Sequence, residues 1–179
     1  MIPFVTVPEN SKTLIQLHFM IKTALITGAT SGIGKATAKL LAQNNFKIVL
    51  CDRRKDRLEA LEKELSAFTA VHHLCFDVRD KKAVFESIAS LPEAFSDIDI
   101  LVNNAGNAHG LDSIQNGDMD DWDAMIDINV KGLLYVSKAI IPKMIAKESG
   151  HIINIGSIAG KEVYPNGNVY CASKYAVDA

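Results

Sequence analysis

The feature that most constrains the fold of this chain is a regular alternation of short apolar segments with longer amphipathic ones. Buried strands of a parallel sheet read as continuous apolar runs, whereas the connecting helices carry apolar residues at every third or fourth position. The expected strands are 22–27, 47–51, 70–76, 99–102 and 151–155, and the expected helices are 34–44, 55–66, 81–91, 118–147 and 169–179. A helix follows each strand, which predicts an α/β protein with a parallel sheet covered on both faces.

The strand order follows from the connections between the strands. Right-handed crossovers and a switch point after the first strand predict a doubly wound (Rossmann) sheet with the order 3-2-1-4-5. We expect residues 20–179 to form this single domain, with a bend near Pro142 in the long fourth helix. Residues 1–19 show no clear periodicity, so they are expected to be a poorly structured N-terminal extension.

Composition excludes several classes of function. The 179 residues carry a formal net charge of only −2, without a basic patch or aromatic platform for nucleic acid and without an apolar run that could span a bilayer. The odd cysteine count (Cys51, Cys75 and Cys171) argues against a disulfide framework. These residues are expected to be small buried hydrophobes in a cytoplasmic protein. The five histidines lack metal-ligand spacing and are expected on the surface or in loops, so no metal site is predicted.

A glycine-rich turn joins the first expected strand to the first helix. Gly28, Gly32 and Gly34 permit a tight turn whose backbone N–H groups approach an anion, and the helix N-terminus adds partial positive charge. The hydroxyls of Thr30 and Ser31 can donate further hydrogen bonds. This arrangement predicts a pyrophosphate site, and hence a dinucleotide.

Two other glycine motifs do not match this turn. A nucleoside-triphosphate P-loop requires glycine at position 29 and Ser or Thr at position 36, and both residues are alanine. The strict G-x-G-x-x-G fingerprint also fails, because the glycine spacing differs.

The turn resembles the cofactor loop of the short-chain dehydrogenase/reductase family, T-G-x-x-x-G-I-G, over residues 27–34. The resemblance extends without a gap over residues 20–179. It rests further on Asp77-Val78, on Asn103-Asn104-Ala105-Gly106, and on Asn129, Ser157, Tyr170 and Lys174 in the family's order. It implies a nicotinamide cofactor held by Gly28, Thr30, Ser31, Gly32, Ile33, Gly34, Asp77, Val78, Asn104, Ala105 and Gly106, with Asp77 accepting from the adenine amino group.

The resemblance also implies a catalytic centre. Tyr170 and Lys174 are four residues apart and therefore lie on one face of a helix. A nearby ammonium favours the phenolate, so Tyr170 can exchange a proton with the alcohol or ketone. Ser157 would hold the substrate oxygen, Lys174 would also bind the ribose near the nicotinamide, and Asn129 is similar to the family residue that positions a water in a proton relay.

The cofactor preference is left open by three residues after the second expected strand. Asp52 would accept from a ribose 2′-hydroxyl and repel a 2′-phosphate, which favours NAD. Arg53 and Arg54 could bind that phosphate, which favours NADP. The most similar subgroup has a small neutral residue before the two arginines and uses NADP, so NADP(H) is expected and NAD(H) is the alternative.

The stretches 98–106, 121–127, 150–160 and 164–170 are similar to a bacterial and fungal subgroup that oxidises 3-hydroxy acids, including serine and L-allo-threonine. The resemblance therefore implies a small-molecule substrate of this class and a homo-oligomer, a dimer or tetramer. Reduction of 3-oxoacyl thioesters or of steroid and other carbonyl substrates is the alternative within the family. The family continues beyond the Tyr–Lys helix with further strands, so a truncated domain with an exposed fifth strand is expected. A dinucleotide-binding relic without turnover is the second hypothesis.

Overall fold

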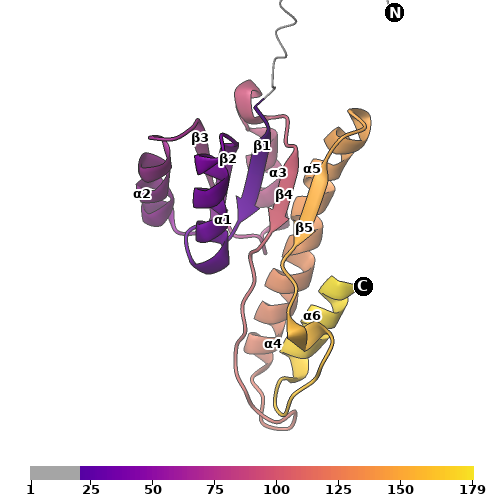
Figure 1. Cartoon of the computed structure of the whole chain (residues 1–179). Helices are drawn as coiled ribbons and strands as arrows, with labels where there is room; N and C mark the ends of the chain where they lie inside the picture. Colours follow the sequence, from indigo (N-terminus) through magenta and orange to yellow (C-terminus); the bar gives the residue numbers. More distant parts are fainter. Residues whose placement is uncertain (1–20) are drawn as a thin grey trace, which may run out of the picture.

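Five parallel strands form a single sheet at the centre of residues 21–179, which are the residues that the computed structural model describes. The strands are β1 (Thr23–Thr27), β2 (Lys47–Asp52), β3 (Val71–Cys75), β4 (Ile100–Asn103) and β5 (His151–Asn154). Their order is β3-β2-β1-β4-β5, so the predicted doubly wound topology is confirmed (Figure 1). The extension expected over residues 1–19 lies outside the described part of the chain.

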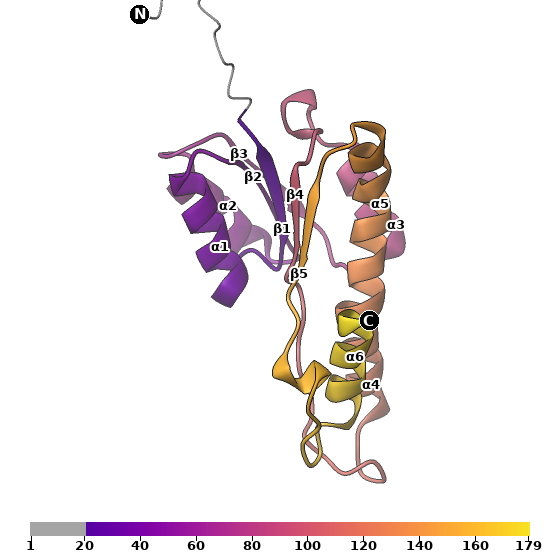
Figure 2. The same ribbon diagram turned by 45° about the vertical axis from the view of Figure 1, so that its right-hand side comes forward.

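Helices cover both faces of the sheet. The α-helices are α1 (Gly32–Gln43), α2 (Lys55–Leu65), α3 (Lys81–Ala89), α4 (Met119–Ile126), α5 (Leu133–Ala146) and α6 (Asn168–Asp178), with short 3₁₀ turns η1 (Glu93–Phe95) and η3 (Ile158–Gly160). Helices α1 and α2 lie on one side of the sheet, and α3 and α5 lie on the other (Figure 2). The ends of the five strands and of α1, α2, α3 and α6 agree with the expected ends within two residues, and α4 and α5 together span the helix expected over 118–147.

The alternation of side chains along the central strand builds two separate cores. Ala24 and Ile26 of β1 pack with α1 and α2, whereas Leu25 between them packs with α3 and α5. Every residue of β1 is buried, as expected for a strand covered on both faces. The two cores fix the sheet rigidly, and the loops at the carboxyl ends of the strands are positioned by it.

The long helix expected over 118–147 departs from α geometry in its middle. Helices α4 and α5 are joined by a π-helical segment, η2 (Asp127–Gly132), and α5 continues past Pro142 to Ala146. The irregularity in helical hydrogen bonding therefore lies before Pro142, and α5 stays helical through this proline. Such π segments are rare and frequently occur at functional sites.

One expectation about residue environments is wrong. Cys75 is exposed at the end of β3, whereas Cys51 and Cys171 are buried as expected. His72 and His73 are partly exposed in β3, and His73 Nδ1 is 2.6 Å from Glu62 Oε2. Cys75 is exposed because β3 is an edge strand, which is only partly covered.

At the opposite edge of the sheet, β5 pairs only with β4 among the described residues, and its four residues are exposed. Within residues 21–179 every helix is too short or too polar to cross a bilayer. The same residues contain no group of three or more potential metal ligands.

Candidate active site

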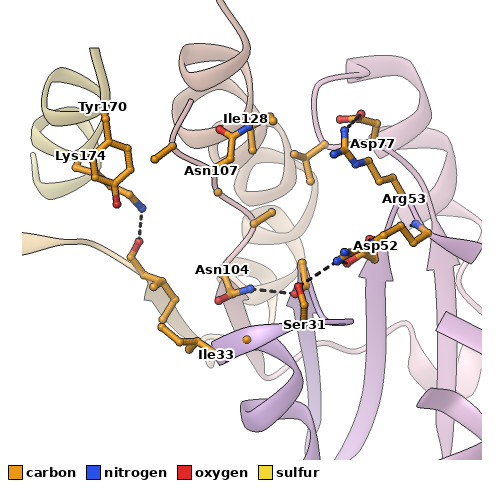
Figure 3. Close-up of a pocket in the computed structure, with 18 of the residues that line it drawn as sticks. Ser31, Ile33, Asp52, Arg53, Asp77, Asn104, Asn107, Ile128, Tyr170 and Lys174 are labelled. Atoms are coloured by element: carbon orange, nitrogen blue, oxygen red, sulfur yellow. Dashed lines mark hydrogen bonds and ion pairs between the residues drawn. The ribbon is translucent and has the colours of Figure 1, made fainter. Parts of the chain in front are cut away.

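A cavity of about 620 Å³ lies at the carboxyl ends of the strands, where doubly wound sheets bind their ligands. Its walls come from the loops that follow all five strands and from helix α6. Figure 3 shows Tyr170 and Lys174 at one end of this cavity and Asp52, Arg53 and Asp77 at the other, with Ser31 and Ile33 between them. The cavity is thus elongated, and its volume is typical of a cofactor site.

The glycine-rich turn after β1 forms the floor of the cavity through Gly28, Ser31, Gly32 and Ile33. Gly28 adopts a φ of +62°, in the left-handed region that glycine occupies without strain. Gly34 does not line the cavity. A Cβ atom there would lie 2.5 Å from both Asn104 Nδ2 and the Gly28 carbonyl oxygen, so glycine is required by close packing.

The turn after β4 is held against the turn after β1 by hydrogen bonds. Thr27 Oγ1 accepts from the backbone N–H groups of Asn104 and Ala105, each at 3.0 Å. Asn104 Nδ2 donates to the carbonyl oxygens of Thr27 and Gly28 at 2.9 and 3.1 Å. Asn104, Ala105 and Gly106 all line the cavity. The side-chain amide of Asn104 therefore holds the glycine-rich turn in place by hydrogen bonds.

Asp52, at the end of β2, is almost fully buried and has both carboxylate oxygens occupied. Oδ2 accepts from Thr30 Oγ1 at 2.7 Å and from Arg54 Nη2 at 3.1 Å, and Oδ1 accepts from Arg54 Nε at 3.1 Å. Burial acts to raise the pKa of Asp52, but these hydrogen bonds outweigh it, so the pKa lies below its ordinary value. Thr30 Oγ1 donates its proton to this carboxylate, and Thr30 does not line the cavity. Its hydroxyl is therefore not available for the pyrophosphate.

The side chains of the two arginines beside Asp52 differ in how many hydrogen bonds restrain them. Arg54 also donates to Ser31 Oγ at 3.1 Å, so its guanidinium joins Asp52 to the glycine-rich turn. The side chain of Arg53 is 62% exposed, and its nearest acidic partner, Asp77 Oδ2, is 3.8 Å away. With Asp77 and the neighbouring Arg79 included, three guanidinium groups and two carboxylates give this end of the cavity a net positive charge, which suits an anionic group.

Asp77 lines the cavity together with Val78, but its carboxylate is engaged by a residue that the sequence analysis missed. Arg79 Nε donates to both of its oxygens at 3.1 Å, and Arg79 Nη2 donates to Oδ2 at 2.7 Å. Burial acts to raise the pKa of Asp77, and the bonds from Arg79 lower it below its ordinary value. The neighbouring Asp80 caps helix α3 by accepting from Ala83 N.

Tyr170 and Lys174 lie together on α6 and face the cavity. Lys174 Nζ is 6.0 Å from the centre of the Tyr170 ring and donates to the Ile155 carbonyl oxygen at 2.9 Å. Lys174 is only 7% exposed, and this burial lowers its pKa below the ordinary value of a lysine. The hydrogen bond to Ile155 holds the ammonium at the mouth of the cavity.

Two further expected site residues, Ser157 and Asn129, do not line the cavity, although their sequence neighbours Gly156 and Ile128 do. Ser157 Oγ accepts from Ala159 N at 3.1 Å and caps the turn η3, which leaves its hydroxyl proton without an acceptor among residues 21–179. Asn129 lies in η2 and is buried. Its Oδ1 accepts from Asn107 N at 2.8 Å, and its Nδ2 donates to Asn107 O at 2.9 Å.

Several cavity residues were not expected from the sequence: Phe76, Asn107, Ala108, Ile128, Ile155 and Gly156. All of them directly flank expected site residues, so extending each motif by one or two positions along its loop would have found them. No comparable signal pointed to Arg79, because its role depends on the side chain folding back onto Asp77.

The comparisons with known proteins agree with this geometry. The sequence profile described as short chain dehydrogenase matches residues 22–179, so the chain belongs to the short-chain dehydrogenase family. A curated relative, the NADP-dependent 3-hydroxy acid dehydrogenase YdfG of Salmonella typhi, is 47% identical over 150 residues. Sulfoacetaldehyde reductase 2 of Chromohalobacter salexigens is 47% identical over 156 residues, 87% of this chain and 62% of that enzyme.

A solved structure, the closed form of serine dehydrogenase complexed with NADP⁺, has a TM-score of 0.82 and 44% sequence identity, and the match covers 87% of this chain and 62% of that one. The match to YdfG covers 84% of this chain and 60% of the relative, so the chain spans about three fifths of the curated relatives' length. The family implies a nicotinamide dinucleotide. The tight glycine turn, the net positive end of the cavity and the buried Lys174 at its other end fit such a group.

Proposed function

We propose that this chain catalyses NADP-dependent oxidation of small 3-hydroxy acids, such as serine or L-allo-threonine. The observation that carries the proposal is that the glycine-rich turn, the arginine pair and the Tyr170–Lys174 pair line one cavity. A nicotinamide dinucleotide held by these residues would supply the acceptor for the hydride from the carbon that bears the substrate hydroxyl. NADP-dependent 3-hydroxy acid dehydrogenase relatives support the substrate class, and a sulfoacetaldehyde reductase relative supports a small acidic molecule.

Four residues of this chain have distinct parts in the proposed reaction. Tyr170 takes the proton of the substrate hydroxyl, and the adjacent Lys174 ammonium assists by electrostatic attraction and binds ribose hydroxyls. The hydroxyl proton of Ser157 is free to be donated to the oxygen of a substrate that extends beyond the cavity residues to the turn η3. Asn129 keeps the loop after β4 in place through its two bonds to Asn107.

NADP is favoured over NAD by the pairing of Asp52. Its charge is balanced by the Arg54 guanidinium and one of its oxygens also accepts from Thr30, so it presents little free negative charge to a 2′-phosphate. Arg53 remains exposed beside it and can bind that phosphate. Ser31 and the N-terminus of α1 would hold the pyrophosphate, and Asp77 would lie near the adenine.

The test is hydride transfer by this chain, followed as NADPH absorbance with serine, L-allo-threonine and 3-hydroxypropanoate. Tyr170→Phe should reduce turnover about 100- to 10,000-fold, the usual contribution of a general base. Tyr175→Phe is the matched control, since Tyr175 lies on the same helix but donates to Lys161 O away from the cavity. Cofactor binding without turnover would favour a binding-only relic, and turnover of only steroids or acyl thioesters would overturn the substrate class.

A further inference from the structure

Ser173 lies between Tyr170 and Lys174 on α6, and its side chain is completely buried. It does not line the cavity, so it contacts neither cofactor nor substrate directly. A polar side chain with no exposure requires hydrogen-bond partners, because an unsatisfied buried hydroxyl destabilises the fold. Its partners show which parts of the protein it connects.

The hydroxyl of Ser173 is bonded on both sides. Ser173 Oγ donates to the Tyr170 carbonyl oxygen at 2.8 Å and accepts from Asn129 Nδ2 at 2.9 Å. The first bond reaches the backbone of Tyr170 itself. The second leaves α6 and reaches the π-helical segment η2, 44 residues earlier in the chain.

Asn129 extends this connection to the cavity wall. Its Nδ2 also donates to Asn107 O, and its Oδ1 accepts from Asn107 N, so both of its polar atoms are used. Asn107 lines the cavity next to Gly106. A continuous path of hydrogen bonds thus runs from the backbone of Tyr170 through Ser173 and Asn129 to the loop that forms the cavity wall.

We propose that Ser173 is a positioning residue, whose hydroxyl fixes the Tyr170–Lys174 face of α6 against Asn129 and hence against the cofactor cavity. The inference rests on the proposed function. Without this hydroxyl, α6 loses its side-chain bond to η2, and the phenol and ammonium sample a wider range of positions. Proton transfer depends on placement within about an ångström, whereas binding of the adenosine end depends on loops after β1 and β2.

The chain offers a matched control in Ser137. It is also buried, lies on a helix (α5), and accepts from an asparagine amide, Asn103 Nδ2, at 2.9 Å. The amide of Asn103 also donates to Asn154 Oδ1 on β5, and among residues 21–179 no side-chain hydrogen bond joins Ser137 or Asn103 to α6. Ser173→Ala and Ser137→Ala therefore remove the same group from similar surroundings, and only the first breaks the path to Tyr170.

The test compares the steady-state kinetics of both variants with those of the unaltered chain. Ser173→Ala should lower kcat about 10- to 100-fold with the KM for NADP⁺ changed less than about threefold. It should also alter the pH dependence of kcat/KM, while Ser137→Ala leaves both close to the unaltered values. Ser173→Cys nearly preserves the side-chain volume but has a weak hydrogen-bonding group, so it should resemble Ser173→Ala.

Three outcomes would overturn the proposal. One is a kcat for Ser173→Ala within twofold of that for Ser137→Ala, and another is full rescue by cysteine, which would assign the effect to packing. If the unaltered chain has no turnover, only the proposed function is rejected. The positioning role of Ser173 is then tested by amide hydrogen exchange. The amides of α6 and η2 should then exchange faster in Ser173→Ala than in Ser137→Ala, and equal exchange would be the third contrary outcome.

Discussion

Single residues in the cavity take their chemical roles from their neighbours rather than from their side-chain type. Asp52 would act as a ribose acceptor if its carboxylate were free, but Arg54 and Thr30 occupy both oxygens. Asp77 is similarly engaged by Arg79. In each case an arginine two residues along the chain folds back onto the acid and neutralises its charge, so Arg53 supplies the net positive charge at this end of the cavity.

The Asp52–Arg54 pair leads to a prediction about cofactor preference. Asp52→Asn removes the negative charge that holds Arg54, so the ratio of kcat/KM for NADP⁺ to that for NAD⁺ should rise about tenfold, equivalent to about 1.4 kcal/mol. Arg54→Ala should lower the same ratio at least as much. Asp97→Asn, which alters a pair with Lys147 remote from the cavity, is the control. A lower ratio in Asp52→Asn would contradict the assignment.

At the scale of elements, the site depends on close contacts between turns that follow different strands. The turn after β1 and the turn after β4 approach so closely that only a glycine fits at position 34. The contact joins the glycine-rich turn to Asn104 and thereby to the loop after β4 that carries Asn107. Helix α6 is attached to the same loop through the π segment η2.

Gly34→Ala tests the contact between these turns. Its Cβ would lie 2.5 Å from the Gly28 carbonyl oxygen, so the turn must shift, and the free energy of unfolding should fall by about 1–3 kcal/mol. Gly156→Ala is the matched control, because a Cβ there meets nothing within 4 Å, and its effect should stay within about 0.5 kcal/mol. Urea unfolding measures both, and equal midpoints for the two variants would show that the close contact is relaxed in solution.

At the scale of the whole molecule, two cores on opposite faces of the sheet hold five loops in one arrangement around the cavity. The cavity spans these loops, so a ligand that fills it contacts segments far apart in the sequence (Figure 3). Such a ligand stabilises the folded state, because the unfolded chain has no comparable site.

Thermal unfolding with cofactor tests the site without requiring turnover. NADP⁺ at about 100 times its Kd should stabilise the fold by about 2.7 kcal/mol, equivalent to a rise in Tm of about 5–10 °C. NAD⁺ at the same concentration should produce a smaller rise, since it lacks the phosphate that Arg53 and Arg54 would bind. 2′,5′-ADP against 5′-AMP provides the same comparison for the adenosine end alone. Equal shifts for each pair would refute the NADP assignment.

The sequence by itself determined the elements and their order, because the patterns involved are local. Apolar runs and helical periodicity located the five strands and the helices α1, α2, α3 and α6 within two residues, and the crossover rule gave the order of the sheet. The glycine-rich turn and the spacing of Tyr170 and Lys174 located the middle and one end of the candidate site for the same reason.

Only the tertiary structure decided which polar groups are free and which are paired. The bonds of Asp52 to Thr30 and of Asn129 to Ser173 join residues 22 and 44 positions apart. Partners at such separations depend on how strands and helices pack, and on side-chain rotamers that no local pattern encodes. The sequence therefore identified most groups of the candidate site, whereas packing set the charge at one end of the cavity and the hydrogen-bonded support of Tyr170 at the other.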